Sequence, residues 1–181
     1  MINHGLIITS DEVNEIYTLL DDITLCFETI YPDLNYEKYK NTNKISEKIN
    51  TIFGINNVSY LCEDGIINEY VNHKPNLLKE KITFPDALIY CGLSLLCVDD
   101  FLNLETELVL YKLRYEEPPK IIVWGLYIYI TSNSLNKCKE IEDVLKANLM
   151  ILDTNLEKTY LCLDEICFLN NWDAEKYRKL L

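Results

Sequence analysis

The sequence predicts an α/β fold whose core is a parallel βαβ unit in a sheet of the nucleotide-fold type. Residues 120–131 are dominated by β-branched and aromatic side chains, a pattern typical of strands that helices cover on both faces. Ser132 and Ser134 then offer helix caps, and residues 135–147 place apolar side chains at helical spacing. Asn148 is expected to end this helix, so that residues 149–152 form a second short strand. A strand, a helix and a strand in this order predict a right-handed crossover between parallel strands.

Glycine usage indicates that this sheet has no phosphate-binding loop. The chain has five glycines, and no two of them have the spacing of GxGxxG or GxxxxGK[ST]. Such loops need glycines so that backbone N–H groups can approach phosphate oxygens. We therefore expect neither NTPase activity nor any other catalysis. Gly125, inside the apolar run, is interpreted as a point of close packing or a bulge.

Strands and helices are expected to alternate along the rest of the chain. The N-terminal elements are a strand at 5–9, a helix capped by Ser10 and Asp11, a strand at 23–30, a turn at 31–35 and a helix at 36–53. Residues 58–71 predict a helix, with a hairpin turning at 63–65 as the alternative because Gly65 suits a helix poorly. The later elements are an exposed turn at 72–76, a helix at 83–93, a strand at 95–98, a helix at 103–115, a loop at 116–119, a strand at 158–163 and a helix at 173–181.

Composition indicates a globular protein of one domain, or of one domain with a protruding subdomain. The chain has 181 residues, of which 49% are hydrophobic and 25% charged. No stretch approaches the roughly 20 apolar residues of a membrane helix, and the N-terminus lacks the pattern of a signal peptide. The expected location is the cytoplasm, with no membrane partner. The seven cysteines lie in apolar settings, never as CxxC, and are expected to be buried reduced thiols.

A net charge of −12 argues against a surface that is generally suited to nucleic acid, but it leaves room for a local basic face. The predicted helix at 36–53 carries lysines at four-residue spacing, which places them on one side. Such a row can neutralise phosphates; an ordinary solvated face is the alternative, because Glu37 and Glu47 flank the row. Two further cations precede Tyr115. The candidate DNA-contacting residues are Lys38, Lys40, Lys44, Lys48, Lys112 and Arg114.

The order of these segments resembles that of the CRISPR type II-A spacer-acquisition accessory proteins, the Csn-two family. KIIVWGLYIYIT, SNSLNKCKEIEDVLKA, NLMILD and KTYLCLDEICFL are similar to the family's apolar strand, charged helix, short strand and final strand. Residues 81–115, and the segment ITLCFETIYPDLNYEKYKNTNKISEKINTIF, are similar to the family's upstream elements. The resemblance covers most of the chain and rests on the order of segments, without an invariant signature.

The resemblance implies a head with a degenerate nucleotide fold, at residues 1–53 and 94–181, and a small helical leg at residues 54–93. It also implies a non-catalytic homotetrameric ring whose lysine-lined hole takes the end of double-stranded DNA during spacer acquisition. The implied partners are the CRISPR integrase and effector proteins, and Ca²⁺ ions would steady the legs.

Two features depart from the family's pattern. The N-terminal portion is shorter, and residues 72–76 read NHKPN where the family has a run of carboxylates for calcium. Because Ca²⁺ takes six to eight oxygen ligands, mainly from carboxylates, the remaining candidates are the nearby acidic residues. These are Glu63, Asp64, Glu69 and Glu80.

Two other classes of protein remain open from the sequence. One is a helical protein-interaction module, such as a viral Bcl-two-like inhibitor, with residues 86–101 as its buried central helix. The other is a phage anti-defence or toxin-immunity protein, which the acidity and small size allow. A helical module predicts negligible strand content, whereas the patterns above predict a substantial strand fraction.

Overall fold

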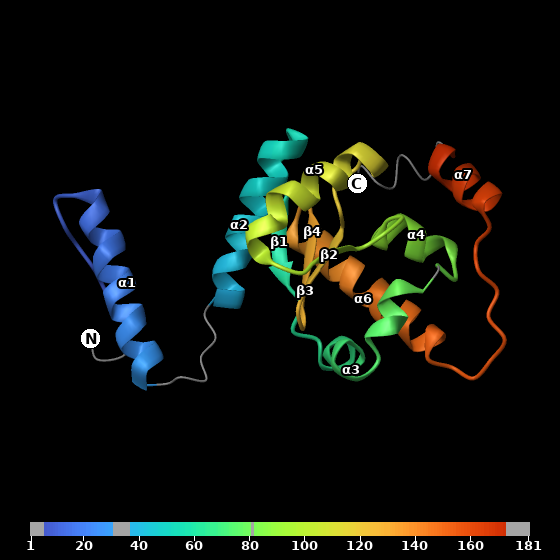
Figure 1. Cartoon of the computed structure of the whole chain (residues 1–181), viewed down its shortest axis with the longest axis horizontal. Helices are drawn as coiled ribbons and strands as arrows, with labels where there is room; N and C mark the ends of the chain where they lie inside the picture. The colour runs from blue at the N-terminus through green and yellow to red at the C-terminus, as the bar shows by residue number, and fades with distance from the viewer. Residues whose placement is uncertain (1–5, 31–36, 81, 173–181) are drawn as a thin grey trace. The chain divides into compact units, whose positions relative to one another are not determined.

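The computed structural model describes residues 6–30, 37–80 and 82–172 (Figure 1). The chain divides into two compact units, Met1–Glu37 and Lys38–Leu181. The described part of the first unit contains one helix, α1 (Val13–Ile30). The strands and the remaining helices follow it in sequence, beginning with α2 (Glu37–Phe53). The predicted turn at 31–35 and the predicted helix at 173–181 lie outside the described residues.

A four-stranded mixed sheet forms the centre of the second unit. Its strands are β1 (Val58–Leu61), β2 (Leu96–Val98), β3 (Ile121–Trp124) and β4 (Tyr127–Ser132). They are arranged in the order β1-β4-β3-β2. β2 and β3 run parallel, whereas β4 is antiparallel to both of its neighbours. The predicted mixed α/β class is therefore confirmed, and the strand content does not fit the all-helical alternative.

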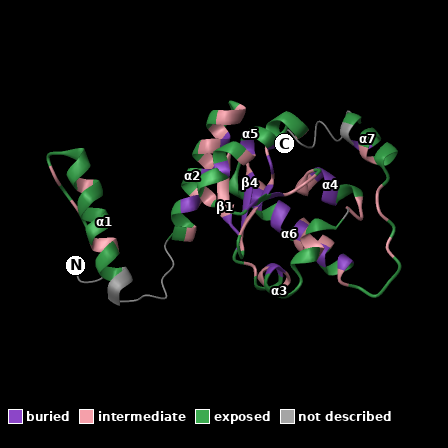
Figure 2. Cartoon of the chain, viewed as in Figure 1, coloured by how far each residue is buried: buried purple, intermediate pink, exposed green. Residues whose placement is uncertain are grey.

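Helices cover both faces of this sheet. Successive strand residues point to opposite faces, so the apolar strands present side chains on both faces that need to be covered. On one face Ile122 and Tyr129 pack against α2 and against α5 (Leu104–Tyr115). On the other face Ile121 and Ile128 pack against α3 (Gly65–His73) and α6 (Leu135–Leu152). Figure 2 shows the buried residues concentrated in the strands and on the sheet-facing sides of these helices. The remaining elements are α4 (Pro85–Cys91), α7 (Leu163–Asn171) and the 3-10 helices η1 (Pro75–Lys79) and η2 (Phe101–Asn103).

The predicted βαβ unit at residues 120–152 is wrong. The apolar run forms a hairpin, in which β3 and β4 pair antiparallel around Gly125 and Leu126. Gly125 has φ +57°, so it is the turn of this hairpin and not a bulge within one strand. Residues 149–152, expected to be a strand, are the last turn of α6. Asn148 does not break that helix, and its Oδ1 accepts a hydrogen bond of 2.7 Å from Thr83 Oγ1.

Parallel pairing occurs instead around α5. The chain passes from β2 through α5 to β3, and β2 and β3 are neighbours in the sheet. The sequence predicted the three elements of this unit but assigned the crossover to the following segment. Three predicted helices are confirmed with small changes of boundary, namely α2, α4 and α5.

Four other segment predictions differ from the structure. Residues 23–30 continue α1 as a helix, and residues 58–71 are neither a helix nor a hairpin but β1 followed by α3. Residues 158–162 have no regular structure, and α7 begins at Leu163. The described part of the predicted strand at 5–9 is also irregular.

The structure describes all seven cysteines and, apart from residue 81, the whole of the expected leg. Residues 54–93 contribute β1, which pairs with β4, so this segment is joined to the sheet. Cys62 and Cys138 are buried as predicted, and Cys91 is half-buried. The prediction is wrong for four cysteines that are exposed, namely Cys26, Cys97, Cys162 and Cys167. Within the described residues, no helix has the length and apolar character needed to cross a membrane.

Candidate nucleic-acid interface

The predicted lysine row lies along one edge of α2. Buried residues recur every four positions on this helix, where Asn41, Ile45 and Ile49 face the sheet. The lysines at 40, 44 and 48 each precede one of these buried residues, so they lie beside the contact with the sheet. Tyr129 of β4 fixes the start of α2, because its hydroxyl donates a hydrogen bond of 3.0 Å to the carbonyl of Lys38.

The three lysines of the row have different surroundings. Lys48 Nζ lies 2.7 Å from Glu105 Oε2 on α5, and hydrogen bonding to this carboxylate raises the pKa of Lys48. Lys44 is exposed and its Nζ lies 5.9 Å from the centre of the Phe101 ring. Lys40 is exposed and has no hydrogen bond or ion pair with the residues that the structure describes. Lys40 and Lys44 are therefore the two members available to an external anion.

Lys38 belongs to a small network at the start of α2. Its Nζ lies 3.5 Å from Glu63 Oε1, which also accepts a hydrogen bond of 2.5 Å from the Tyr39 hydroxyl. Partial burial acts to lower the pKa of Lys38, but Tyr39 and Glu63 outweigh it and raise the pKa overall. The hydrogen bond from Tyr39, together with Lys38, lowers the pKa of Glu63. Lys38 is thus partly neutralised within the protein.

The two predicted cations of α5 lie on the same side of the sheet. Lys112 donates a hydrogen bond to the carbonyl of Ile52 in α2, and its Nζ lies 5.3 Å from the centre of the Phe53 ring. Arg114 lies over the ring of Tyr115, 5.2 Å from its centre. The fold therefore brings all six predicted residues onto the two helices that cover one face of the sheet. We call this surface the α2–α5 face.

The four predicted calcium ligands are not brought together. Asp64 is the N-cap of α3, accepting from the N–H groups of Ile66 and Ile67 through Oδ1, while its Oδ2 lies 2.6 Å from Lys146 Nζ. The Lys146 hydrogen bond, with those N–H groups, lowers the pKa of Asp64. Glu63 pairs with Lys38 as described, and Glu80 accepts a long hydrogen bond of 3.5 Å from Tyr160. Among the described residues no group of three or more His, Cys, Asp or Glu side chains is placed to hold a metal ion.

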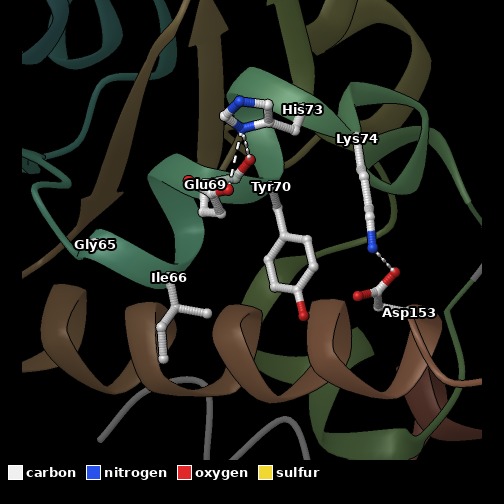
Figure 3. A pocket seen from close by; sticks show the side chains of 7 residues that line it. All are labelled: Gly65, Ile66, Glu69, Tyr70, His73, Lys74 and Asp153. Carbon is white, nitrogen blue, oxygen red and sulfur yellow. Dashed lines mark hydrogen bonds and ion pairs between the residues drawn. The ribbon is translucent and has the colours of Figure 1, made fainter.

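The fourth of these carboxylates, Glu69, lines a pocket between α3 and the end of α6. The cavity measures about 410 Å³ (Figure 3). His73 Nδ1 lies 3.2 Å from Glu69 Oε1, and Lys74 Nζ lies 2.5 Å from Asp153 Oδ1. Figure 3 shows the Tyr70 ring between these two pairs, with its hydroxyl toward α6. Lys74 and Asp153 thus neutralise one another, while Glu69 lies beside the His73 ring.

Sequence reasoning missed this pocket. The sequence predicted an exposed turn at residues 72–76. The spacing of Glu69 and His73, four residues apart, was the available signal, because such residues are neighbours on a helix. The contact between Lys74 and Asp153 could not be predicted from the sequence, because these residues are 79 positions apart.

Comparisons with known proteins give no assignment: no family model matches the chain, and neither a curated protein nor a solved structure is significantly similar to it.

Proposed function

We propose that this chain binds the phosphate backbone of double-stranded DNA, without catalysing a reaction on it, through the α2–α5 face. The observation that carries the proposal is the state of Lys40 and Lys44. Both are exposed, they are one helical turn apart, and neither pairs with a carboxylate in the described part of the chain. Ammonium groups arranged in this way can replace the counterions of DNA phosphates.

The distribution of charge supports the same surface. The first 37 residues contain no Lys or Arg, and they carry −8 of the net charge of −12. Their acidic residues are Asp11, Glu12, Glu15, Asp21, Asp22, Glu28, Asp33 and Glu37. All 17 basic residues belong to the second unit, which therefore has a net charge of only −4. The unit that contains the α2–α5 face thus repels phosphate much less than the average for the whole chain suggests.

The resemblance to the Csn-two family adds a biological setting to this proposal. It would make the second unit part of a degenerate nucleotide-fold head, and it would place the lysines in the hole of a homotetrameric ring at a DNA end. The same resemblance leads us to expect bound calcium ions, CRISPR integrase and effector proteins as partners, and a cytoplasmic location. The α2–α5 face supports the binding step, and the setting in CRISPR adaptation rests on the resemblance alone.

A filter-binding assay with linear and circular duplex DNA tests the proposal. The variant Lys40→Glu/Lys44→Glu/Lys48→Glu should lose binding, while the wild type should weaken with salt by a slope of about −0.9 per phosphate contacted. The matched control is Lys74→Glu/Lys79→Glu/Lys139→Glu, which makes the same change of charge away from the α2–α5 face.

Three results would remove the proposal. They are an absence of binding by the wild type at low salt, full binding by the first variant, and equal losses in both variants. Equal losses would mean that total charge, not the α2–α5 face, governs binding. Preference for linear over circular DNA would support the ring setting, whereas equal binding to both forms would leave backbone contact without end recognition.

A further inference from the structure

Four aromatic side chains form a row next to the turn of the β3–β4 hairpin, on the side of the sheet that carries the α2–α5 face. The ring centres of Phe101 and Trp124 are 5.2 Å apart, and those of Trp124 and Tyr127 are 5.8 Å apart. Lys38 connects Tyr127 with Tyr39, because its Nζ lies 6.0 Å and 4.7 Å from these two ring centres. We call Tyr39, Tyr127, Trp124 and Phe101 the aromatic row.

The lysines that accompany the aromatic row all come from α2. Lys38 lies between two of the rings, and Lys44 Nζ lies 5.9 Å from the centre of the Phe101 ring. Lys40, which is exposed, lies between these two lysines in the sequence. The rings and the lysines all belong to the second unit, so their arrangement does not depend on the position of the first unit.

The protein core holds these rings in place without covering them completely. Phe101, Trp124 and Tyr127 are half-buried and pack against the core between the sheet and the helices α2 and α5. The Tyr39 side chain is exposed, and its hydroxyl donates a hydrogen bond of 2.5 Å to Glu63 Oε1. Rings held in this way lose little side-chain freedom when a ligand contacts them, which favours binding.

Aromatic rings have little to contact along the body of a DNA duplex. There the base faces are stacked on one another, and a protein reaches only the base edges and the phosphate backbone. Base faces become accessible in a single strand, or where the end of a duplex opens. Proteins that bind single strands combine cations, which follow the phosphates, with aromatic side chains on which the bases stack.

We propose that the aromatic row binds unpaired bases of single-stranded DNA, such as a frayed duplex end, while Lys40 and Lys44 hold the adjoining phosphates. The inference deepens the proposed function and rests on its phosphate contacts. Stacking requires no net positive surface, because every base has a π-face that an aromatic ring can meet. It therefore adds affinity that suits a chain with a net charge of −12.

Equilibrium binding of the full chain to three DNAs tests the inference. They are a blunt duplex, the same duplex with a single-stranded oligothymidine tail, and the oligothymidine strand alone. The wild type should bind the tailed duplex more tightly than the blunt duplex, by about tenfold for each base that stacks. Tyr39→Leu/Phe101→Leu should lose most of this advantage while it binds the blunt duplex as the wild type does.

The matched control is Tyr70→Leu/Tyr90→Leu, which removes two half-buried rings on the other side of the sheet and should keep the advantage. Circular dichroism checks that each variant is folded. If the double variant of the aromatic row unfolds, Tyr39→Leu alone replaces it, because the Tyr39 ring is exposed.

Trp124 gives a direct readout of base contact. The chain has two tryptophans, so Trp172→Phe leaves Trp124 as the only one. A base that stacks on the aromatic row should quench the fluorescence of Trp124 as oligothymidine is added. Unchanged fluorescence at saturating oligothymidine would overturn the inference.

Failure of the inference and failure of the proposed function give different results. Equal binding of the tailed and blunt duplexes by the wild type would overturn the inference and leave duplex binding intact. The inference would also fall if the advantage persisted without the two rings, or if the control variant lost it equally. Binding of oligothymidine without any binding of the blunt duplex would overturn the proposed duplex binding and leave base contact as the role of the aromatic row.

Discussion

Lys48 and Glu105 are 57 residues apart in sequence, yet Lys48 Nζ lies 2.7 Å from Glu105 Oε2, across the boundary between α2 and α5. The contact exists because both helices pack on the same face of the sheet. It gives the third lysine of the row a carboxylate partner within the protein. Of the three lysines of the row, Lys40 and Lys44 therefore remain without an ion pair to the residues that the structure describes.

Replacing this carboxylate should strengthen DNA binding. In Glu105→Gln, Lys48 loses its ionic partner and becomes available to a phosphate, so we expect tighter binding and a salt slope steeper by about 0.9. Stability should hardly change, since exposed ion pairs contribute little. Filter binding over a series of salt concentrations measures both quantities.

Glu140→Gln is the matched control for this experiment. It also removes the exposed carboxylate of an ion pair, because Glu140 Oε2 lies 3.0 Å from Lys137 Nζ on α6, on the other side of the sheet. Affinity should rise in Glu105→Gln and hardly change in Glu140→Gln. Equal affinities in the wild type and Glu105→Gln would show that Lys48 does not touch DNA.

The core beneath the α2–α5 face should respond sharply to truncation. Leu108→Ala removes a side chain of α5 that is 0% exposed, so the free energy of unfolding should fall by about 3 kcal/mol. Leu113→Ala, on the same helix, truncates a side chain that is 78% exposed and should change that free energy by less than about 0.5 kcal/mol. Urea denaturation measures both. Similar losses in the two variants would mean that the outer side of α5 is covered in solution.

The sequence predicted the periodic elements of the fold but not the direction of the chain through its apolar core. α2 has a clear apolar side, because it packs on the sheet with one side only. The run at 120–131 is buried on both faces, so polar residues do not alternate along it and nothing but Gly125 marks the reversal. In α1 the β-branched residues of 23–30 favoured a strand, and the three-four spacing that extends back to Val13 is what favours a helix.

The hairpin turn gives a direct test of this correction. Gly125→Ala places a side chain at φ +57°, which costs about 1 to 2 kcal/mol for a residue with a Cβ. Gly65→Ala, at the first position of α3, has no such conformation and should stabilise the protein by about 0.5 kcal/mol. Neither new Cβ would meet an atom within 4 Å, so the two variants differ in backbone conformation and not in crowding. Thermal denaturation that ranks the two in the opposite order would contradict the turn.

The sequence predicted that the three lysines of α2 lie in one row, but it did not predict which residues surround them on the folded surface. Helical spacing alone placed Lys40, Lys44 and Lys48 together. Their partners depend on tertiary packing, which decides that Glu105 reaches Lys48 while Lys40 has no such neighbour in the described chain. The carboxylates proposed for calcium were close in sequence, but folding gave each a different partner. Closeness in sequence therefore did not bring these acidic residues together at one metal site in the described part of the chain.

Asp64 provides the last prediction, because it caps α3 with one oxygen and binds Lys146 with the other. The hydrogen bond from Lys146, with the N–H groups of α3, lowers the pKa of this carboxyl from its ordinary value of 3.8. A carboxyl whose pKa is lowered by folding stabilises the native state above that ordinary value, and this contribution is lost as the pH falls through the folded pKa. Asp64→Asn keeps a good N-cap but removes the charge.

The free energy of unfolding of Asp64→Asn should therefore be lower than that of the wild type at neutral pH. The difference should shrink as the pH falls below about 4, because Asp64 of the unfolded chain takes up its proton there while the folded carboxyl is still ionised, and it should be lost once the folded carboxyl is protonated as well. Urea denaturation at a series of pH values measures this difference, with Asp99→Asn as the control because Asp99 is exposed and has no hydrogen bond to the described residues. A difference that stays constant across the pH series would show that the Lys146 contact does not stabilise the folded state through charge.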